Sequence, residues 1–176
     1  MRSFHATSVT LALLAALLAV VLAPAVAHSQ DVVIYEVYSG GGEPGATFQN
    51  DFVVLFNAGT SAVDLSQWSL QVNFGGQTWQ AVPLCGSIPH GRFFLVTLGS
   101  SGPFGDPVPP GDCQGNPNLP LTVGAVTLVS DPGTLPETCP LANPLLVDLV
   151  GEEGNTSFLT NEWGIDRHEL CLLRDG

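Results

Sequence analysis

Glycine and proline are spread so densely through this chain that few segments after residue 30 are long enough to form a helix. The chain contains 20 glycines and 14 prolines, and both residues destabilise a helix interior. Between them lie short apolar runs, rich in β-branched and aromatic residues, which are typical of β-strands. The runs are residues 32–38, 51–57, 67–74, 77–82, 92–98, 124–130, 145–150 and 169–174. Many short strands separated by turns predict an all-β sandwich or barrel.

The run at 67–74 has the clearest alternation of apolar and polar residues. Its two registers are Trp68, Leu70, Val72 and Phe74 on one side, and Ser69, Gln71 and Asn73 on the other. Because successive side chains of a strand point to opposite faces, we expect the apolar face in the core and the polar face in solvent. Gly75-Gly76 follows and is typical of a two-residue hairpin loop.

Residues 1–27 have the layout of a secretory signal peptide. Arg2 precedes an apolar run at 9–22, which is followed by Pro24 and the small-residue site Ala25-Val26-Ala27. This order predicts cleavage after Ala27 and export of the remainder. We place a single mature domain at 31–176, and we expect no membrane span, since no later run approaches about 18 apolar residues.

The chain is strongly acidic, with 16 Asp and Glu against 4 Lys and Arg and a formal net charge of −12. Binding to nucleic acid relies on Lys and Arg side chains that neutralise phosphates. We therefore expect no direct contact with nucleic acid and no attraction to anionic membranes. The charge favours solubility in an exported protein, and attraction of divalent cations is the alternative.

Four cysteines follow the signal segment, at Cys85, Cys113, Cys139 and Cys171. An even number of cysteines in an exported chain favours two disulfides. Three pairings are available. We favour Cys85–Cys113 with Cys139–Cys171, because each closes a loop of moderate length without crossing the other. A structural zinc site is the alternative, although no C-x-x-C pair is present.

Gly40, Gly42 and Gly45 form a G-x-G-x-x-G sequence directly after the first apolar run, and Asp64 lies about 20 residues further on, as in a dinucleotide-binding fingerprint. That fingerprint requires a helix after the glycines, because the pyrophosphate binds at the N-terminus of the helix. Here a β-branched and aromatic run follows instead, and Glu43 would place a negative charge beside the phosphates. We therefore predict that the glycines allow positive φ angles and close backbone packing.

An ordered series of segments resembles the bacterial form of the lamin tail domain. The series is VVIYEVYSGGGEPGATFQNDFVVLFNAGTSAVDLSQWSLQ at 32–71, CGSIPHGRFFLVTLG at 85–99, GAVTLVSD at 124–131 and LLVDLVGEEG at 145–154. Asn57, Asp64, Leu65 and Trp68 match the family pattern, whereas Val54 stands where relatives usually have a glutamate. The resemblance implies an immunoglobulin-like β-sandwich, in agreement with the strand pattern. Relatives often carry further modules, including secreted nucleases and phosphatases, and we expect none in this chain.

Two long loops, 39–50 and 99–123, hold the candidate binding residues. These residues are Gly40, Gly42, Glu43, Gly45, Asn50, Asp51, Asp106 and Asp112. We expect no cofactor, with calcium as the alternative. A calcium ion would be held by Glu36 and Asp51 together with backbone carbonyls. The other interpretation is that these acids cap turns and accept hydrogen bonds from backbone N–H groups.

Candidate catalytic and carbohydrate-binding groups have simpler structural interpretations. His168 is flanked by carboxylates in Asp166-Arg167-His168-Glu169, but neighbouring residues on a strand point to opposite faces. We therefore favour local ion pairing over general-base catalysis there, and we interpret His90 as a turn residue. Trp68 and Trp79 would form a carbohydrate platform only if both were exposed, and the register of Trp68 favours the core. No G-x-S-x-G or H-E-x-x-H motif is present.

These patterns predict a non-catalytic recognition module that is secreted or lies in the periplasm or cell envelope. Its partner would be an extracellular or envelope protein or a polysaccharide, bound through the loops. The alternative is an accessory or catalytic component of extracellular nuclease or phosphoesterase activity, such as a metal-dependent phosphoesterase. That alternative is implied only by the modules that accompany the family.

Overall fold

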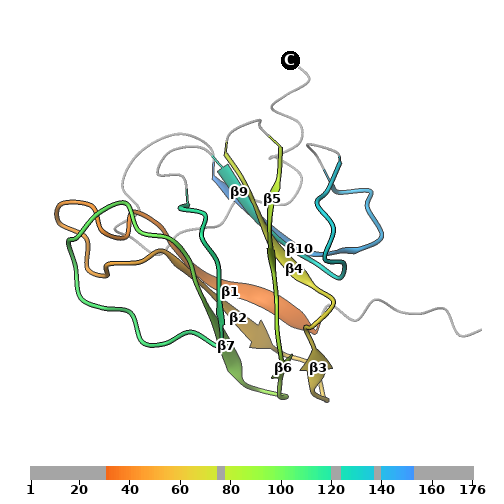
Figure 1. Cartoon of the computed structure of the whole chain (residues 1–176). Coiled ribbons are helices and arrows are strands. Elements are labelled where there is room, and N and C mark those ends of the chain that lie inside the picture. Colours follow the sequence, from red (N-terminus) through yellow and green to blue (C-terminus); the bar gives the residue numbers. More distant parts are fainter. Residues whose placement is uncertain (1–30, 75–77, 120–123, 137–139, 153–176) are drawn as a thin grey trace, which may run out of the picture.

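The computed structural model describes residues 31–74, 78–119, 124–136 and 140–152, and within these ranges the chain forms ten strands and no helix (Figure 1). The predicted all-β class is therefore confirmed. In the described ranges no helix is long and apolar enough to cross a membrane. The proposed signal peptide at 1–27, the Gly75-Gly76 turn and the run at 169–174 lie outside the described residues, as does the pair Cys139 and Cys171.

The first sheet has the strand order β1-β2-β7-β8. Its strands are β1 (Val32–Tyr38), β2 (Phe52–Asn57), β7 (Phe93–Thr97) and β8 (Cys113–Gln114). The pairs β1–β2 and β2–β7 are antiparallel, and β8 adds to β7 in parallel. Strand β1 contains a bulge between Ile34 and Glu36, where one extra residue is inserted into the pairing with β2.

The second sheet has the order β10-β9-β4-β5, and all of its pairs are antiparallel. Its strands are β4 (Ser69–Asn73), β5 (Gln80–Pro83), β9 (Gly124–Val129) and β10 (Leu146–Glu152). A small third sheet pairs β3 (Val63–Asp64) with β6 (Ser87–Ile88). The sequence pattern missed β3, β6 and β8, because two residues are too few to show a period.

The main core lies between the two larger sheets. Fully buried residues such as Val53, Leu55 and Val96 come from the first sheet, and Leu70 and Leu128 come from the second. Along each strand, these core residues alternate with residues on the outer face of the sheet, because successive side chains of a strand point to opposite faces. The result is a β-sandwich of the predicted immunoglobulin-like kind.

The prediction that one face of β4 is exposed to solvent is wrong, since all five of its residues are buried. The residues after β9 fold back over this face, and we call 131–135 the covering segment. The side chain of Gln71 binds it twice: Nε2 donates to the Gly133 carbonyl at 2.8 Å, and Oε1 accepts from the Leu135 N–H at 3.0 Å. The hydroxyl of Ser69 donates to the Asp131 carbonyl at 2.7 Å. The polar register is thus buried because its hydrogen bonds are made within the protein.

A second apolar cluster lies beneath the covering segment. Its buried members are Trp79, Ala125, Val129, Leu135 and Leu149. Trp79 is only 4% exposed, whereas Trp68 is half-buried against the main core. The two tryptophans therefore belong to different clusters and do not form a shared carbohydrate platform.

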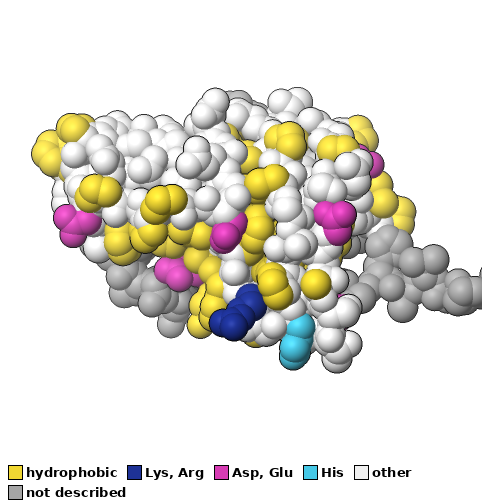
Figure 2. Space-filling view, turned by 60° about the horizontal axis from the view of Figure 1, so that its bottom comes forward, with side chains coloured by type: hydrophobic (Ala, Val, Ile, Leu, Met, Phe, Trp, Pro, Cys, Tyr) yellow, Lys and Arg dark blue, Asp and Glu magenta, His cyan; other side chains and the backbone are white. Residues whose placement is uncertain are grey.

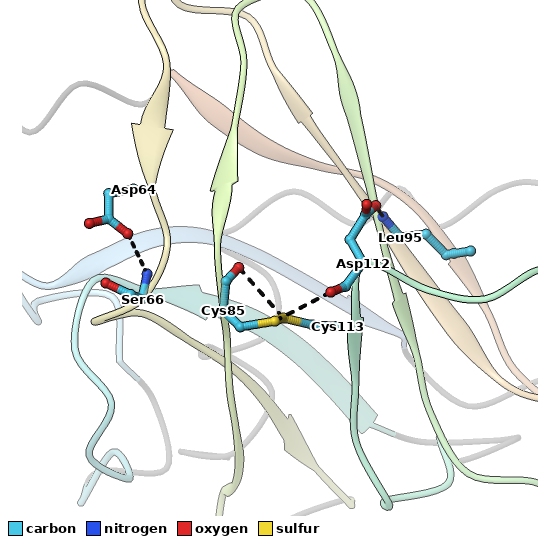
Figure 3. The surroundings of a disulfide bond; sticks show 6 residues. All are labelled: Asp64, Ser66, Cys85, Leu95, Asp112 and Cys113. Atoms are coloured by element: carbon cyan, nitrogen blue, oxygen red, sulfur yellow. Dashed lines mark hydrogen bonds between the residues drawn. A yellow bond between two sulfur atoms is a disulfide. The ribbon is translucent and has the colours of Figure 1, made fainter.

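A disulfide joins the two sheets at their edges, with Cys85 just after β5 and Cys113 in β8 (Figure 3). The Cα atoms lie 6.0 Å apart, as is usual for a disulfide. The predicted Cys85–Cys113 pairing is confirmed. Next to it, the Asp112 carboxylate accepts a hydrogen bond from the Leu95 N–H at 2.8 Å, so this part of the long loop is held against β7.

Candidate functional site

The two candidate loops form one body at one end of the sandwich. We call residues 39–50 and 99–106 together the loop unit; they run side by side in Figure 1. Backbone hydrogen bonds join them: Ser101 N–H to the Gly41 carbonyl at 2.9 Å, Gln49 N–H to the Asp106 carbonyl at 2.8 Å, and Asp106 N–H to the Thr47 carbonyl at 2.9 Å. The backbone groups of both loops are thus paired with each other, as in a small sheet.

Glycine is required where the two loops approach most closely. Gly42 has a φ of 83°, and a Cβ there would overlap the backbone of Gly102 on the other loop. Gly105 has a φ of 90°, and a Cβ there would overlap the backbone of Phe48. Both positions combine a left-handed conformation with a lack of space, so only glycine fits. The structural role predicted for the glycines is confirmed at Gly42, and β2 rather than a helix follows the motif.

Asp51 fastens the loop unit to the sandwich from beneath. Its side chain is fully buried at the start of β2. One carboxylate oxygen accepts a hydrogen bond from the Gly41 N–H, and the other accepts one from the Leu119 N–H, both at 2.7 Å. Its backbone pairs with Leu98 and Gly99 at the end of β7, each bond measuring 2.8 Å. One residue therefore connects the glycine loop, the first sheet and the segment that leads to β9.

Burial raises the pKa of Asp51 from 3.8 to about 6, and the negative charge of Glu43 acts in the same direction. The hydrogen bonds from Leu119 and Gly41 oppose this shift, because they stabilise the ionised form. Desolvation is the larger effect. The carboxylate is therefore charged at neutral pH and takes up a proton in mildly acidic solution.

The structure brings most of the predicted binding residues together and separates one of them. The residues within or directly below the loop unit are Gly40, Gly42, Glu43, Gly45, Asn50, Asp51 and Asp106. Of these, Gly45 and Asp106 are exposed, whereas Asn50 is half-buried and its amide donates to the Leu98 carbonyl at 3.1 Å. Asp112 lies outside the unit, beside β7 and the disulfide (Figure 3).

Glu36 and Asp51, the pair expected to hold a calcium ion, lie in different surroundings. Glu36 is exposed on β1, whereas both carboxylate oxygens of the buried Asp51 already accept N–H groups. Among the described residues no group of three or more His, Cys, Asp and Glu side chains is placed to hold a metal ion. His90 contacts the Gly59 carbonyl through Nδ1, in a turn, and His168 lies outside the described residues.

Two exposed aromatic features were not expected from the sequence. Phe104, whose backbone pairs with Gly42 in the loop unit, is 51% exposed. Tyr35 and Phe93, on the outer face of the first sheet, are 61% and 55% exposed. The sequence carried one signal for the second feature, the adjacent pair Phe93-Phe94. On a strand these two side chains must point to opposite faces, so one of them cannot enter the core.

A family model described as the lamin tail domain matches residues 25–134. The match extends over every strand from β1 to β9 and over both parts of the loop unit. No curated protein matches the sequence. The matched strands build a sandwich of the same immunoglobulin-like kind that the segments at 32–71 and 85–99 imply.

Proposed function

The chain belongs to the lamin tail domain family, and from this premise we propose that it is a secreted, non-catalytic recognition module. Its partner is an extracellular or envelope protein or polysaccharide, and it is bound through the loop unit. A lamin tail domain of this kind supplies a stable sandwich whose loops are available for contact. The proposal rests on the site itself as well as on the fold, because one fold can serve many functions.

The observation that carries the proposal is the pairing of the two loops over Asp51. The backbone of the loop unit is ordered before any partner arrives, by the bonds from Ser101, Gln49 and Asp106 and by the buried carboxylate. Binding to ordered loops costs less conformational entropy than binding to free ones. Part of the loop unit nevertheless remains open to solvent, since Phe104 is half-exposed and Asp106, two residues further on, is exposed. An exposed aromatic ring on a rigid support is typical of the residues that contribute most to binding.

Export is supported by two features of the chain. The layout of residues 1–27 is that of a cleavable secretory signal. The Cys85–Cys113 disulfide is of a kind that persists outside the cytosol. Export would place the loop unit where envelope proteins, polysaccharides and secreted enzymes are the available partners.

Affinity capture with matched variants tests the proposal. The oxidised mature chain, residues 28–176, is immobilised and exposed to envelope extract and to spent medium of the host, with calcium and with a chelator. We expect one saturable partner, identified by mass spectrometry or glycan analysis. Phe104→Ser should weaken its binding about tenfold or more, because a half-exposed ring at the centre of a contact contributes about 1–2 kcal/mol.

Leu145→Ser is the matched control, since it also removes an exposed apolar side chain but leaves the loop unit unchanged. Retention of the partner by Leu145→Ser and its loss by Phe104→Ser supports the loop unit as the binding site. Capture that is equal for wild type and Phe104→Ser contradicts that assignment. Metal-dependent phosphodiesterase activity of the purified chain would contradict the non-catalytic part and favour the enzymatic alternative.

A further inference from the structure

The bulge in β1 exposes two consecutive side chains on the outer face of the first sheet. Ile34 lies opposite Leu55 and Glu36 lies opposite Val54, so Tyr35 is the inserted residue. In a regular strand Tyr35 and Glu36 would point to opposite faces. Both are exposed here. Because of the bulge, Glu36 lies opposite Val54, whose side chain is on the outer face, and Ile34 lies opposite the core residue Leu55. Bulges often occur where a strand redirects a side chain toward a binding site.

Three aromatic rings meet beside this bulge. Phe93 lies directly opposite Phe56 in the pairing of β7 with β2. The ring centroid of Phe93 is 4.9 Å from that of Tyr35 and 4.9 Å from that of Phe56. Half-buried Val54 and Leu95 form the next cross-strand pair on the same face. We call these five residues, together with Glu36, the aromatic face.

This face is unusual for the solvent side of a sheet. Where one face of an antiparallel sheet meets water, polar residues normally alternate with the core residues. Here the same register of β2 and β7 holds Val54, Phe56, Phe93 and Leu95, followed at its other end by the pair of buried Phe52 with Thr97. Exposed apolar groups that lie together are typical of a contact surface. The inference from this face does not depend on the loop unit or on Phe104.

We infer that the aromatic face binds a basic segment of another protein, one that presents Lys or Arg side chains next to apolar groups. The rings attract a cation through their electron-rich faces, and Glu36 adds a negative charge at the same place. Arg92 is the single Lys or Arg among the described residues, so the rest of the described charge is acidic. Figure 2 shows acidic side chains around exposed hydrophobic groups, with a basic side chain among them.

The charge of the molecule opposes two other possible occupants of the aromatic face, a second copy of this chain and an acidic polymer. A second copy of this chain would bring together two molecules with a formal net charge of −12 each, and like charges oppose association. An acidic polymer would meet the same repulsion. The negative charge of the whole molecule attracts a basic partner. The affinity for that partner should therefore decrease as added salt screens the attraction.

Binding of three short peptide probes to the oxidised mature chain tests this inference. The probes alternate lysine with leucine, lysine with serine, and glutamate with leucine. Fluorescence anisotropy at low and at physiological salt gives their affinities. We expect the lysine–leucine probe to bind most tightly. The lysine–serine probe should bind more weakly because it lacks the apolar part, and the glutamate–leucine probe should not bind.

The double variant Tyr35→Ser/Phe93→Ser should reduce the affinity for the lysine–leucine probe about tenfold or more, since it removes both cation–π contacts and apolar area. Leu145→Ser is the matched control, because it removes an exposed apolar side chain that belongs to neither the aromatic face nor the loop unit, and it should bind that probe as wild type does. Glu36→Gln keeps all the rings and should reduce the affinity about threefold through the lost charge. This single substitution of an exposed side chain keeps the test valid if the double variant fails to fold.

Three results would overturn the inference. The first is equal affinity of wild type and both aromatic-face variants for the lysine–leucine probe. The second is equal binding of the glutamate–leucine probe, which would show that apolar contact alone is responsible. The third is a dimer of the wild-type chain in sedimentation equilibrium that becomes monomeric in the double variant, because the face would then be occupied by a second copy.

Discussion

The two large sheets of this sandwich differ in what lies on their outer faces. On the second sheet the outer face of β4 and β9 is closed by the covering segment, and even the polar side chains of Ser69, Gln71 and Thr127 are buried there. On the first sheet the outer face remains open, and Tyr35 and Phe93 are more than half exposed. Both faces carry large apolar side chains, so composition alone does not separate them.

The two outer faces differ because only the second sheet binds a covering segment. Gln71 offers one donor and one acceptor to the covering segment, and Leu135 inserts into the cluster around Trp79. Within the part of the chain that the structure describes, no side chain of the aromatic face holds a second segment as Gln71 does. Asp51 fastens the loop unit at one end of the same sheet. An apolar face under a cover adds to stability, whereas an open one is available to a partner.

Trp79→Ala should produce the largest loss of stability, because it empties the cluster beneath the covering segment. We expect the free energy of unfolding to fall by about 4 kcal/mol, the usual cost of truncating a buried aromatic residue. Urea denaturation followed by circular dichroism measures it. A loss below about 1 kcal/mol would mean that the covered face is no better packed than the open one.

Gln71→Leu should cost about 3 kcal/mol, although it makes the covered face more apolar. The substitution leaves the Leu135 N–H and the Gly133 carbonyl without partners, and each such group carries a desolvation penalty of about 1–3 kcal/mol. Gln67→Leu is the matched control, because Gln67 is exposed and its replacement should change stability by less than about 0.5 kcal/mol. Equal effects of the two variants would show that Gln71 does not anchor the covering segment.

Asp51 holds the loop unit through side-chain hydrogen bonds, as Gln71 holds the covering segment. Because Asp51 is ionisable, its contribution to stability depends on pH. Its pKa is raised from 3.8 to about 6 on folding, so the folded state binds the proton more tightly than the unfolded state does. The penalty for the buried charge is present above about pH 6 and disappears as the pH falls toward 4. We therefore expect Asp51 to add about 2 kcal/mol of stability between pH 7 and pH 4.

The measurement is the difference in unfolding free energy between wild type and Asp51→Asn across this pH range. The difference removes the effect of the remaining acids, whose mutual repulsion also decreases on acidification. Gln71→Leu should show no such pH dependence relative to wild type. A difference curve that is flat for Asp51→Asn would show that the buried carboxylate does not titrate in this range.

Tyr35→Ser/Phe93→Ser should have the smallest effect on stability, about 1 kcal/mol. Two ring contacts on the outer face are lost, and cross-strand pairs of this kind contribute about 0.2–1 kcal/mol each. Thermal unfolding measured beside Trp79→Ala makes the comparison direct. A loss as large as that of Trp79→Ala would mean that the open face is part of the core, and the contrast between the two sheets would fail.

Local patterns predicted the strands well, because the alternation of side chains is a property of neighbouring residues. The run at 32–38 coincides with β1, and the runs at 92–98 and 124–130 contain β7 and β9. The Cys85–Cys113 pairing also followed from the spacing of the cysteines. The same alternation misled the prediction for β4, because it reports which residues share a face but not what covers that face.

The sequence predicted most residues of the candidate site, but it did not predict how they contact one another. Gly42 and Asp51 stood out in the sequence, yet the bonds that define their roles join positions far apart in the chain. The Asp51 carboxylate binds the N–H of Leu119, 68 residues away, and Gly42 touches Gly102. The bulge at Tyr35 left no local signal either, since it exists only through the register between β1 and β2.

The sequence by itself determined the all-β class, the position of most strands and the need for glycine in the first loop. These properties depend on backbone propensity and on side-chain period, which act over a few residues. Only the tertiary structure decided which sheet face is covered, why a carboxylate is buried at Asp51, and where an aromatic surface stays open. Those outcomes depend on hydrogen bonds and contacts between segments that lie far apart in the sequence, such as Asp51 with Leu119.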